Sequence, residues 1–126
     1  MKRILLDTNV VVWLLLGDRA SVSADAVRAL EDASNEVALS AASVWEIAVK
    51  RSLGKLTIPD GWARVLARLG FAPMPVTAVH AEAVEQLPWH HRDPFDRLLV
   101  AQASVERCAL VTADRRLAAY GIGILW

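Results

Sequence analysis

Apolar residues follow two patterns along this chain. Some form short unbroken runs bounded by polar residues, which is typical of strands buried on both faces. Others recur every three or four positions or fill longer runs, as they do in helices. The first pattern predicts strands at residues 3–7, 36–40, 72–76, 109–114 and 122–126. The second pattern predicts helices at residues 10–16, 24–33, 43–54, 62–70, 77–87, 94–108 and 115–121.

This alternation of strands and helices predicts the fold class. Strands separated by helices of this length form parallel sheets that carry helices on both faces. We therefore expect an α/β fold, a three-layer α/β/α sandwich around a central parallel sheet. Pro73 and Pro75 favour an edge position for the strand at residues 72–76, because proline cannot donate a hydrogen bond to a neighbouring strand. A chain of 126 residues without repeats or linkers is expected to form one domain, residues 1–126.

Composition bears on the location and the partners of the protein more than on its activity. Apolar residues make up 55% of the chain, enough for a packed core and for an additional oligomer interface. The 14 basic and 14 acidic residues cancel, so bulk charge predicts neither nucleic acid nor a membrane as a partner. Cys108 is the only cysteine, and the apolar run at residues 10–16 is too short to cross a membrane. Both features favour a reducing, cytoplasmic location.

Acidic residues lie close to the predicted start of several helices. Asp7 ends the first strand, and Glu46 lies in the first turn of the helix that follows the second strand. Asp96 lies in the first turn of the helix opened by Pro94, and Asp114 follows the strand "ALVT". Ligands of parallel sheets bind beyond the carboxyl ends of the strands. The four carboxylates are therefore expected to face one edge of the sheet.

Helix capping explains each of these acids when it is taken alone. Ser43 and Glu46 fit a capping box, and Lys50 can pair with Glu46 four residues earlier. Asp93 is a good N-cap ahead of Pro94 at the first helical position. Capping does not explain why four elements each bring a carboxylate to one edge, since Ser, Thr or Asn would cap equally well.

Clustered carboxylates repel one another, and a divalent cation removes this repulsion. Ligation by carboxylates alone favours Mg²⁺ or Mn²⁺ over zinc. The neighbouring His90 and His91 lack the spacing of paired ligands on a helix, and we interpret them as solvated loop residues. Mg²⁺ is commonly shared with substrate phosphate, so the site is expected to carry out phosphoryl chemistry.

Four blocks of sequence in order resemble a known family. The blocks are "ILLDTNVVVWLL", "SAASVWEIAVKRSLGKLTIP", "HRDPFDRLLVAQA" and "LVTADRRL". Together they resemble PIN-domain proteins and, more narrowly, the VapC-like ribonuclease toxins of type II toxin–antitoxin pairs. The resemblance covers nearly the whole chain. It implies a sandwich of helices around a parallel sheet, metal-dependent endoribonuclease activity, and inhibition by a cognate antitoxin protein.

The resemblance also assigns residues. The catalytic and metal-binding acids of the family fall on Asp7, Glu46, Asp96 and Asp114. Asp7 and Asp96 are expected to be the principal ligands, with Glu46 beside them, whereas Asp114 is expected to bind a second metal or to act through water. Asn9 stands where family members often carry His. Hydroxyl groups that would contact a ligand carboxylate or the substrate belong to Thr8, Ser43 and Thr112, for which an ordinary structural role is the alternative.

Contacts with RNA and protein are predicted from basic and aromatic residues. A local positive rim near the acids would consist of Lys50, Arg51, Arg92, Arg97, Arg115 and Arg116. Among these, Arg97 directly follows Asp96 and is the preferred phosphate ligand, with ordinary ion pairing as the alternative. Trp45 and Trp13 are expected in the core, and Trp89 either stacks on a base or is a buried anchor. The apolar surplus fits a homodimer and, by the resemblance, a groove for the antitoxin.

Two other functions remain open at this point. A non-catalytic RNA- or protein-binding domain would have the same fold, although the complete set of four acids argues against it. A Mg²⁺-dependent phosphatase similar to the haloacid dehalogenases also uses an aspartate after the first strand. That chemistry needs a second acid where this chain has Asn9, which cannot supply a proton.

Overall fold

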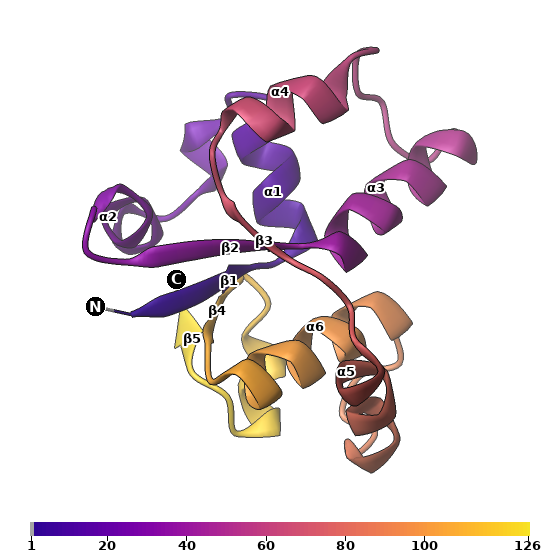
Figure 1. The fold of residues 1–126 in the computed structure, drawn as a ribbon. Helices are drawn as coiled ribbons and strands as arrows, with labels where there is room; N and C mark the ends of the chain where they lie inside the picture. The colour runs from indigo at the N-terminus through magenta and orange to yellow at the C-terminus, as the bar shows by residue number, and fades with distance from the viewer. Residues whose placement is uncertain (1) are drawn as a thin grey trace.

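The computed structural model describes residues 2–126, and its centre is one parallel sheet (Figure 1). The strands are β1 (Arg3–Leu6), β2 (Glu36–Ser40), β3 (Ala72–Met74), β4 (Ala109–Val111) and β5 (Ile124–Leu125). They lie in the order β3-β2-β1-β4-β5. The proline-containing β3 is an edge strand, as its sequence predicts.

The predicted helices are present with small changes in their bounds. The α-helices are α1 (Thr8–Leu15), α2 (Ala24–Glu31), α3 (Ala41–Ser52), α4 (Trp62–Arg68), α5 (Ala78–Ala83) and α6 (Pro94–Glu106). Short 3₁₀ turns form η1 (Arg19–Ser21), η2 (Val84–Gln86) and η3 (Arg115–Tyr120). The segment predicted as one helix over residues 77–87 therefore tightens into a 3₁₀ turn at its end, before Pro88. None of the helices within residues 2–126 combines the length and apolar character needed to cross a membrane.

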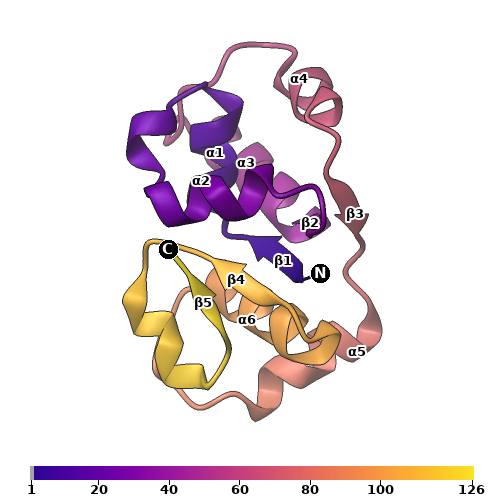
Figure 2. The same cartoon turned by 90° about the vertical axis from the view of Figure 1, so that its left-hand side faces the viewer.

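Alternating side chains of the sheet form two cores. Ile4 and Leu6 of β1 belong to one apolar cluster with residues of α1, α2, α3 and α4. Leu5 points the other way and belongs to a second cluster, with Leu99 and Val100 of α6. Figures 1 and 2 show α1, α2 and α4 on one side of the sheet and α5 and α6 on the other. The predicted three-layer α/β/α sandwich is confirmed.

The strand order creates a crevice where the chain changes direction. The chain adds β2 and β3 on one side of β1 and then returns to add β4 and β5 on the other side. Segments that leave neighbouring strands in opposite directions open a crevice at the carboxyl ends of those strands. Leu6 lies beside Val111 in the register of β1 and β4, and the amide of Asp7 donates to the carbonyl of Val111 at 3.0 Å. The residues after β1 and β4 therefore line the same crevice.

The register of α3 departs from the expected core. Trp45, predicted to be buried, is 59% exposed, and its ring meets that of Phe95 at an angle of 64° with the centroids 4.9 Å apart. Glu46, the next residue, is 3% exposed. A helix turns about 100° per residue, so neighbouring side chains face different directions, and here the buried one of the two is Glu46. This helix exposes an indole and buries a carboxylate, which is the opposite of what hydrophobicity alone favours.

Candidate active site

Asp7 is buried at the end of β1 and is held from the neighbouring strand. It precedes α1, but its side chain makes no capping hydrogen bond, so its capping interpretation is wrong. Its Oδ2 instead accepts a 2.7 Å hydrogen bond from Thr112 Oγ1, as the sequence suggested for Thr112. Burial raises the pKa of Asp7, although the Thr112 bond opposes this shift. Thr112 Oγ1 also accepts from the amide of Asp114 at 3.0 Å, and it thereby orders both acid-bearing segments.

The start of α3 differs from the predicted capping box. The N-cap is Ser40, whose Oγ accepts from the amide of Ala42 at 3.0 Å. Ser43 lies inside the helix, and its Oγ accepts a 2.9 Å hydrogen bond from Thr8 Oγ1 on α1. The predicted pairing of Ser43 with Glu46 is therefore wrong, and Glu46 lies in the second turn rather than the first. Because the cap lies three residues earlier, Glu46 is free to point toward the crevice.

Glu46 has one paired and one unpaired oxygen. Lys50 Nζ lies 2.6 Å from its Oε2, so the pair predicted four residues apart is confirmed. Its Oε1 is buried and has no hydrogen-bond partner among residues 2–126. A buried carboxylate oxygen without a partner costs about 1–3 kcal/mol, which is a strong reason to expect a missing ligand.

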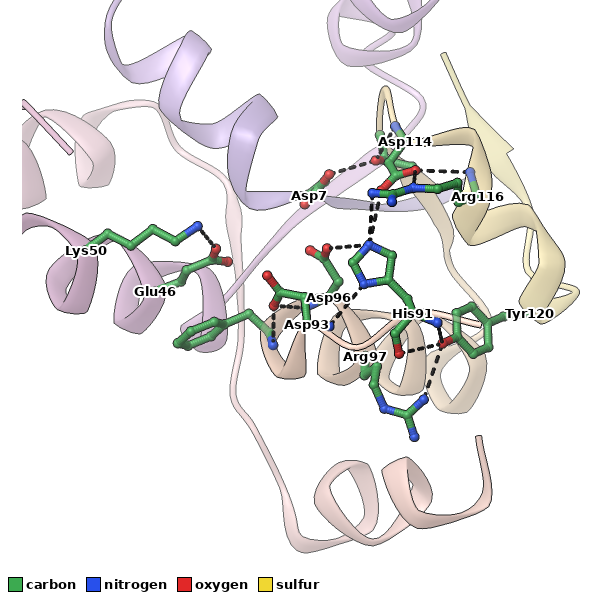
Figure 3. Close-up of polar contacts among 12 residues, drawn as sticks. Asp7, Glu46, Lys50, His91, Asp93, Asp96, Arg97, Asp114, Arg116 and Tyr120 are labelled. Carbon is green, nitrogen blue, oxygen red and sulfur yellow. Dashed lines mark hydrogen bonds and ion pairs between the residues drawn. The ribbon is translucent and has the colours of Figure 1, made fainter. Parts of the chain in front are cut away.

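Asp93 and Asp96 divide their roles at the start of α6. Asp93 is the N-cap, as predicted, and its Oδ1 accepts from the amides of Phe95 at 2.8 Å and Asp96 at 3.2 Å. The side chain of Asp96 is left free to face the crevice. Burial, followed by repulsion from Asp7, raises the pKa of Asp96 to about 7. Figure 3 shows the carboxyl groups of Asp7 and Asp96 turned toward each other.

Asp114 forms an ion pair with the guanidinium of Arg116. It caps η3 by accepting from the amide of Arg116 at 3.1 Å. The Arg116 guanidinium donates to both of its oxygens, from Nε to Oδ1 at 2.9 Å and from Nη2 to Oδ2 at 2.8 Å. These contacts lower the pKa of Asp114. The capping interpretation therefore holds for Asp114, which also faces the crevice (Figure 3).

His91 belongs to the site, although its sequence context predicted a solvated loop residue. Its Nε2 lies 3.4 Å from Oδ2 of Asp96 and 3.4 Å from Oδ2 of Asp114. Its Nδ1 accepts from the amide of Asp93 at 3.1 Å, so we assign the proton of the neutral ring to Nε2. These three side chains lie close enough to share an ion. The assigned tautomer nevertheless makes His91 a donor to the carboxylates and leaves oxygens as the available ligands.

Arg97 does not lie in the site. It is 3% exposed, and its guanidinium donates to the carbonyls of Pro88, Val84 and Leu87 at 2.9 to 3.2 Å. The prediction that it binds phosphate is therefore not supported, because the residue after Asp96 is turned to another face of α6. The ring of Trp89 lies over this guanidinium at 3.8 Å, and Trp89 is 76% exposed rather than a buried anchor.

The remaining basic residues fall into two groups. Lys50 and Arg116 point into the site and each pairs with one acid. Arg51 is directed away, toward Asp60 and the carbonyl of Ile58, whereas Arg92 and Arg115 are exposed. Several residues of the predicted positive rim are therefore paired with acids of the chain itself.

The four acids come from four separate elements and lie along one edge of the sheet (Figure 3). Within the described residues, Asp96 and Asp114 lie with His91 close enough to share an ion, whereas Asp7 and Glu46 are not part of that group. A family model of the PIN domain matches residues 4–123 of the chain. The chain belongs to the PIN domain family. A search among curated proteins found no match.

Solved structures with the same fold come from several bacteria. VapBC2 from Rickettsia felis, bound to a DNA fragment from its promoter, is similar with a TM-score of 0.73 and 16% identity over 97% of this chain and 96% of that one. DNA-bound VapBC from Salmonella typhimurium has a TM-score of 0.67 and 18% identity, with 98% and 97% covered. FitAcB from Neisseria gonorrhoeae has a TM-score of 0.62 and 23% identity, with 96% and 95% covered. At these identities the likeness shows that the PIN fold is shared along the whole chain.

Proposed function

We propose that this PIN domain, residues 1–126, is a Mg²⁺- or Mn²⁺-dependent endoribonuclease and the toxin of a type II toxin–antitoxin pair. The observation that carries the proposal is the buried Oε1 of Glu46, which lacks a partner among residues 2–126. It lies with Asp7 and Asp96, neither of which pairs with Lys or Arg within those residues. A divalent cation would relieve the repulsion between Asp7 and Asp96 and would give Glu46 Oε1 a partner once the side chains draw together around it. In the described residues, the group whose ligand atoms all lie within 4.8 Å of one another is His91, Asp96 and Asp114. The oxygen-only donor set favours Mg²⁺ or Mn²⁺ over zinc.

Each acid has a role in this proposal. Asp7, Asp96 and Glu46 would hold the ion, and Asp114 would complete the site directly or through water. The bound ion would supply an activated water and would stabilise charge on the phosphate oxygens. Thr112 orients Asp7 through its 2.7 Å hydrogen bond, and His91 donates toward Asp96 and Asp114. The bond between Thr8 and Ser43 joins α1 to α3 and fixes the direction in which Glu46 points.

An antitoxin segment would bind away from the acids, in a cavity of about 270 Å³. Its lining is mostly apolar, from Leu14, Val22, Val27, Leu30, Leu69 and Phe71. Arg19 and Glu31 stand at the same cavity and pair with each other. An amphipathic helix with an apolar face is the kind of segment that fits such a groove. Trp45 of α3 and Leu53, the C-cap of that helix, are 59% and 62% exposed and are candidates for a homodimer contact in the cytoplasm.

Metal-dependent RNA cleavage tests the enzymatic part of the proposal. Purified protein is incubated with total RNA in Mn²⁺, in Mg²⁺ and in EDTA, and the new RNA ends are sequenced. We expect cleavage with either ion, none in EDTA, and none by the Asp7→Asn variant. Equal RNA binding by both proteins without cleavage would instead identify a non-catalytic binding domain.

The toxin role has a separate test. The protein is expressed alone and together with the small protein encoded by the adjacent gene. We expect growth arrest in the first case and its relief in the second, with loss of RNA cleavage by the purified complex. Growth arrest that persists with the partner present would contradict an antitoxin role for that partner.

A further inference from the structure

Two basic side chains occupy the acidic crevice, and they are held differently. Lys50 extends from the same helix as its partner Glu46, and its side chain is 40% exposed. Arg116 lies in the 3₁₀ turn that follows Asp114, and its side chain is 74% exposed. The Arg116 guanidinium contacts both oxygens of Asp114, which are the atoms that a metal or its water would use. Arg116 therefore stands where a divalent cation and Asp114 would meet.

We propose that Arg116 is an exchangeable counter-ion, which neutralises Asp114 in the metal-free protein and turns to an RNA phosphate once metal is bound. This inference rests on the proposed nuclease function. It adds a substrate-binding residue in place of Arg97, whose guanidinium is buried among carbonyl groups. A guanidinium that bridges two carboxylate oxygens has the geometry to bridge two phosphate oxygens as well.

The contacts of Arg116 are weak enough to exchange. An exposed ion pair is worth about 0–1 kcal/mol, so a dication can compete for Asp114. The other close neighbour of Arg116 Nη2 is Nε2 of His91, at 3.1 Å. With the proton assigned to Nε2, this is a contact between two donors and does not hold the guanidinium in place. Asp96 adds a longer-range attraction, which also vanishes when a dication neutralises the acids.

The backbone does not need to change for this exchange. The amide of Arg116, rather than its side chain, makes the capping bond to Asp114 at 3.1 Å. An Arg116→Ala variant therefore keeps the cap of η3 and loses only the guanidinium. Arg115 offers a matched control, because it is the preceding residue of the same turn, is exposed, and has no polar side-chain partner among residues 2–126.

Manganese binding tests the first half of the proposal without any RNA. The dissociation constant for Mn²⁺ is measured from the electron paramagnetic resonance signal of the free ion, for the wild type, Arg116→Ala and Arg115→Ala. Removing a competing cation should tighten Mn²⁺ binding of Arg116→Ala by about three- to fivefold. Arg115→Ala should change it by less than about twofold, since Arg115 is exposed and pairs with none of the acids among residues 2–126. Equal effects of the two variants, or none, would overturn the proposal.

The salt dependence of RNA binding tests the second half. Stopped-flow anisotropy with a fluorescent mixed-sequence 20-nucleotide RNA is read before cleavage begins, in Mn²⁺ and in EDTA. The logarithm of the RNA association constant falls as the logarithm of the salt concentration rises. Each lost phosphate contact makes this slope less steep by about 0.7 to 1. Arg116→Ala should lose about one contact in Mn²⁺ and none in EDTA, where the wild-type guanidinium is held by Asp114. Equal slopes of the two proteins in Mn²⁺ would overturn the exchange. Both expected differences in a protein that leaves RNA uncut would reject the nuclease function and keep Arg116 as an exchangeable counter-ion.

Discussion

Two largely buried polar clusters include residues of α6, and they differ in whether the protein itself supplies all the hydrogen-bond partners. The His80 cluster consists of Ser40, His80, Gln102 and Glu106. His80 Nδ1 accepts from the amide of Thr77 at 3.1 Å, and its Nε2 lies 2.9 Å from Glu106 Oε1. Gln102 Oε1 accepts from Ser40 Oγ at 2.5 Å. Both ring nitrogens and the Gln102 oxygen therefore have partners of the chain itself.

The acidic crevice is the opposite case. Glu46 keeps an unpaired buried oxygen, and repulsion together with burial raises the pKa of Asp96 to about 7. The histidines do not distinguish the clusters, because His91 is held through Nδ1 by a backbone amide just as His80 is. What differs is the balance of charge: His80 faces one carboxylate, which Arg3 also contacts, whereas His91 faces two. A polar cluster whose hydrogen bonds are all made within the protein stabilises the fold. A cluster that leaves a buried polar atom unpaired, or like charges close together, is a candidate ligand-binding site.

Asp7→Asn should produce the largest effect, on activity. We expect RNA cleavage to fall by about 10³-fold or more, since a neutral amide replaces a charged ligand, equivalent to about 4 kcal/mol of transition-state stabilisation. Unfolding stability in EDTA should stay the same or increase, because one of the repelling charges is gone. Single-turnover cleavage and urea unfolding measure the two quantities. A large loss of unfolding stability in EDTA would show instead that Asp7 has a structural role, as the His80 cluster does.

His80→Ala should show the reverse pattern. Its removal opens a cavity where the fully buried ring stood and leaves the part-buried amide of Thr77 without its partner, which should lower the free energy of unfolding by about 2–4 kcal/mol. Cleavage per folded molecule should change less than about twofold, because the ring contacts none of the four acids. Glu82→Ala, at an exposed position of the same helix, is the control for helix propensity. Loss of activity in fully folded His80→Ala would contradict the division between the clusters.

The fold was predictable because its signals are local. Strands buried on both faces form apolar runs, and the two prolines at β3 correctly mark an edge. Asp93 as the cap of α6 was predictable for the same reason, since a cap needs only its neighbours in sequence. The 3₁₀ form of η3 was not, because short helical turns of both kinds share one pattern.

The position of the four acids along one edge of the sheet was predictable, but the partners of these acids were not. Asp-bearing segments after β1 and β4 must meet once the strand order is fixed. His91 meets Asp114 only through the folding of a loop, and no periodicity records that contact. The capping box failed because Ser40 and Ser43 compete for the same role, and the packing of Ser43 against Thr8 decides between them. The Arg97 prediction failed because neighbouring residues in a helix point about 100° apart, so adjacency in sequence does not place two side chains in one site.

The pH dependence of stability should separate the clusters further. A carboxyl whose pKa is raised to about 7 is favoured in its protonated form by folding, so the metal-free protein should lose stability as pH rises from about 4 to 7. The expected loss is about 2 kcal/mol, less than the full shift implies because water reaches this carboxyl. Urea unfolding in EDTA measures it, with Asp96→Asn as the reference that lacks the group. If the free energy of unfolding of both proteins changed with pH in the same way, repulsion among the acids of the crevice would be contradicted.

Thr8 and Ser43 lie beside the acidic crevice, but their hydroxyl groups are paired with each other. If complete hydrogen bonding marks a structural role, this pair should behave like the His80 cluster. Ser43→Ala should lower the free energy of unfolding by about 1 kcal/mol, with a coupling of similar size to Thr8→Val in a double-mutant cycle.

Cleavage by folded Ser43→Ala should fall less than about threefold, as a small shift of α3 re-aims Glu46. The alternative from the sequence is that Ser43 contacts the substrate itself. That role would reduce cleavage more than tenfold while the coupling to Thr8 stays near zero, since the hydroxyl would then matter to the substrate and not to α1. Measuring both quantities on the same variants decides whether completeness of hydrogen bonding, rather than nearness to the acids, separates structural from functional polar groups in this protein.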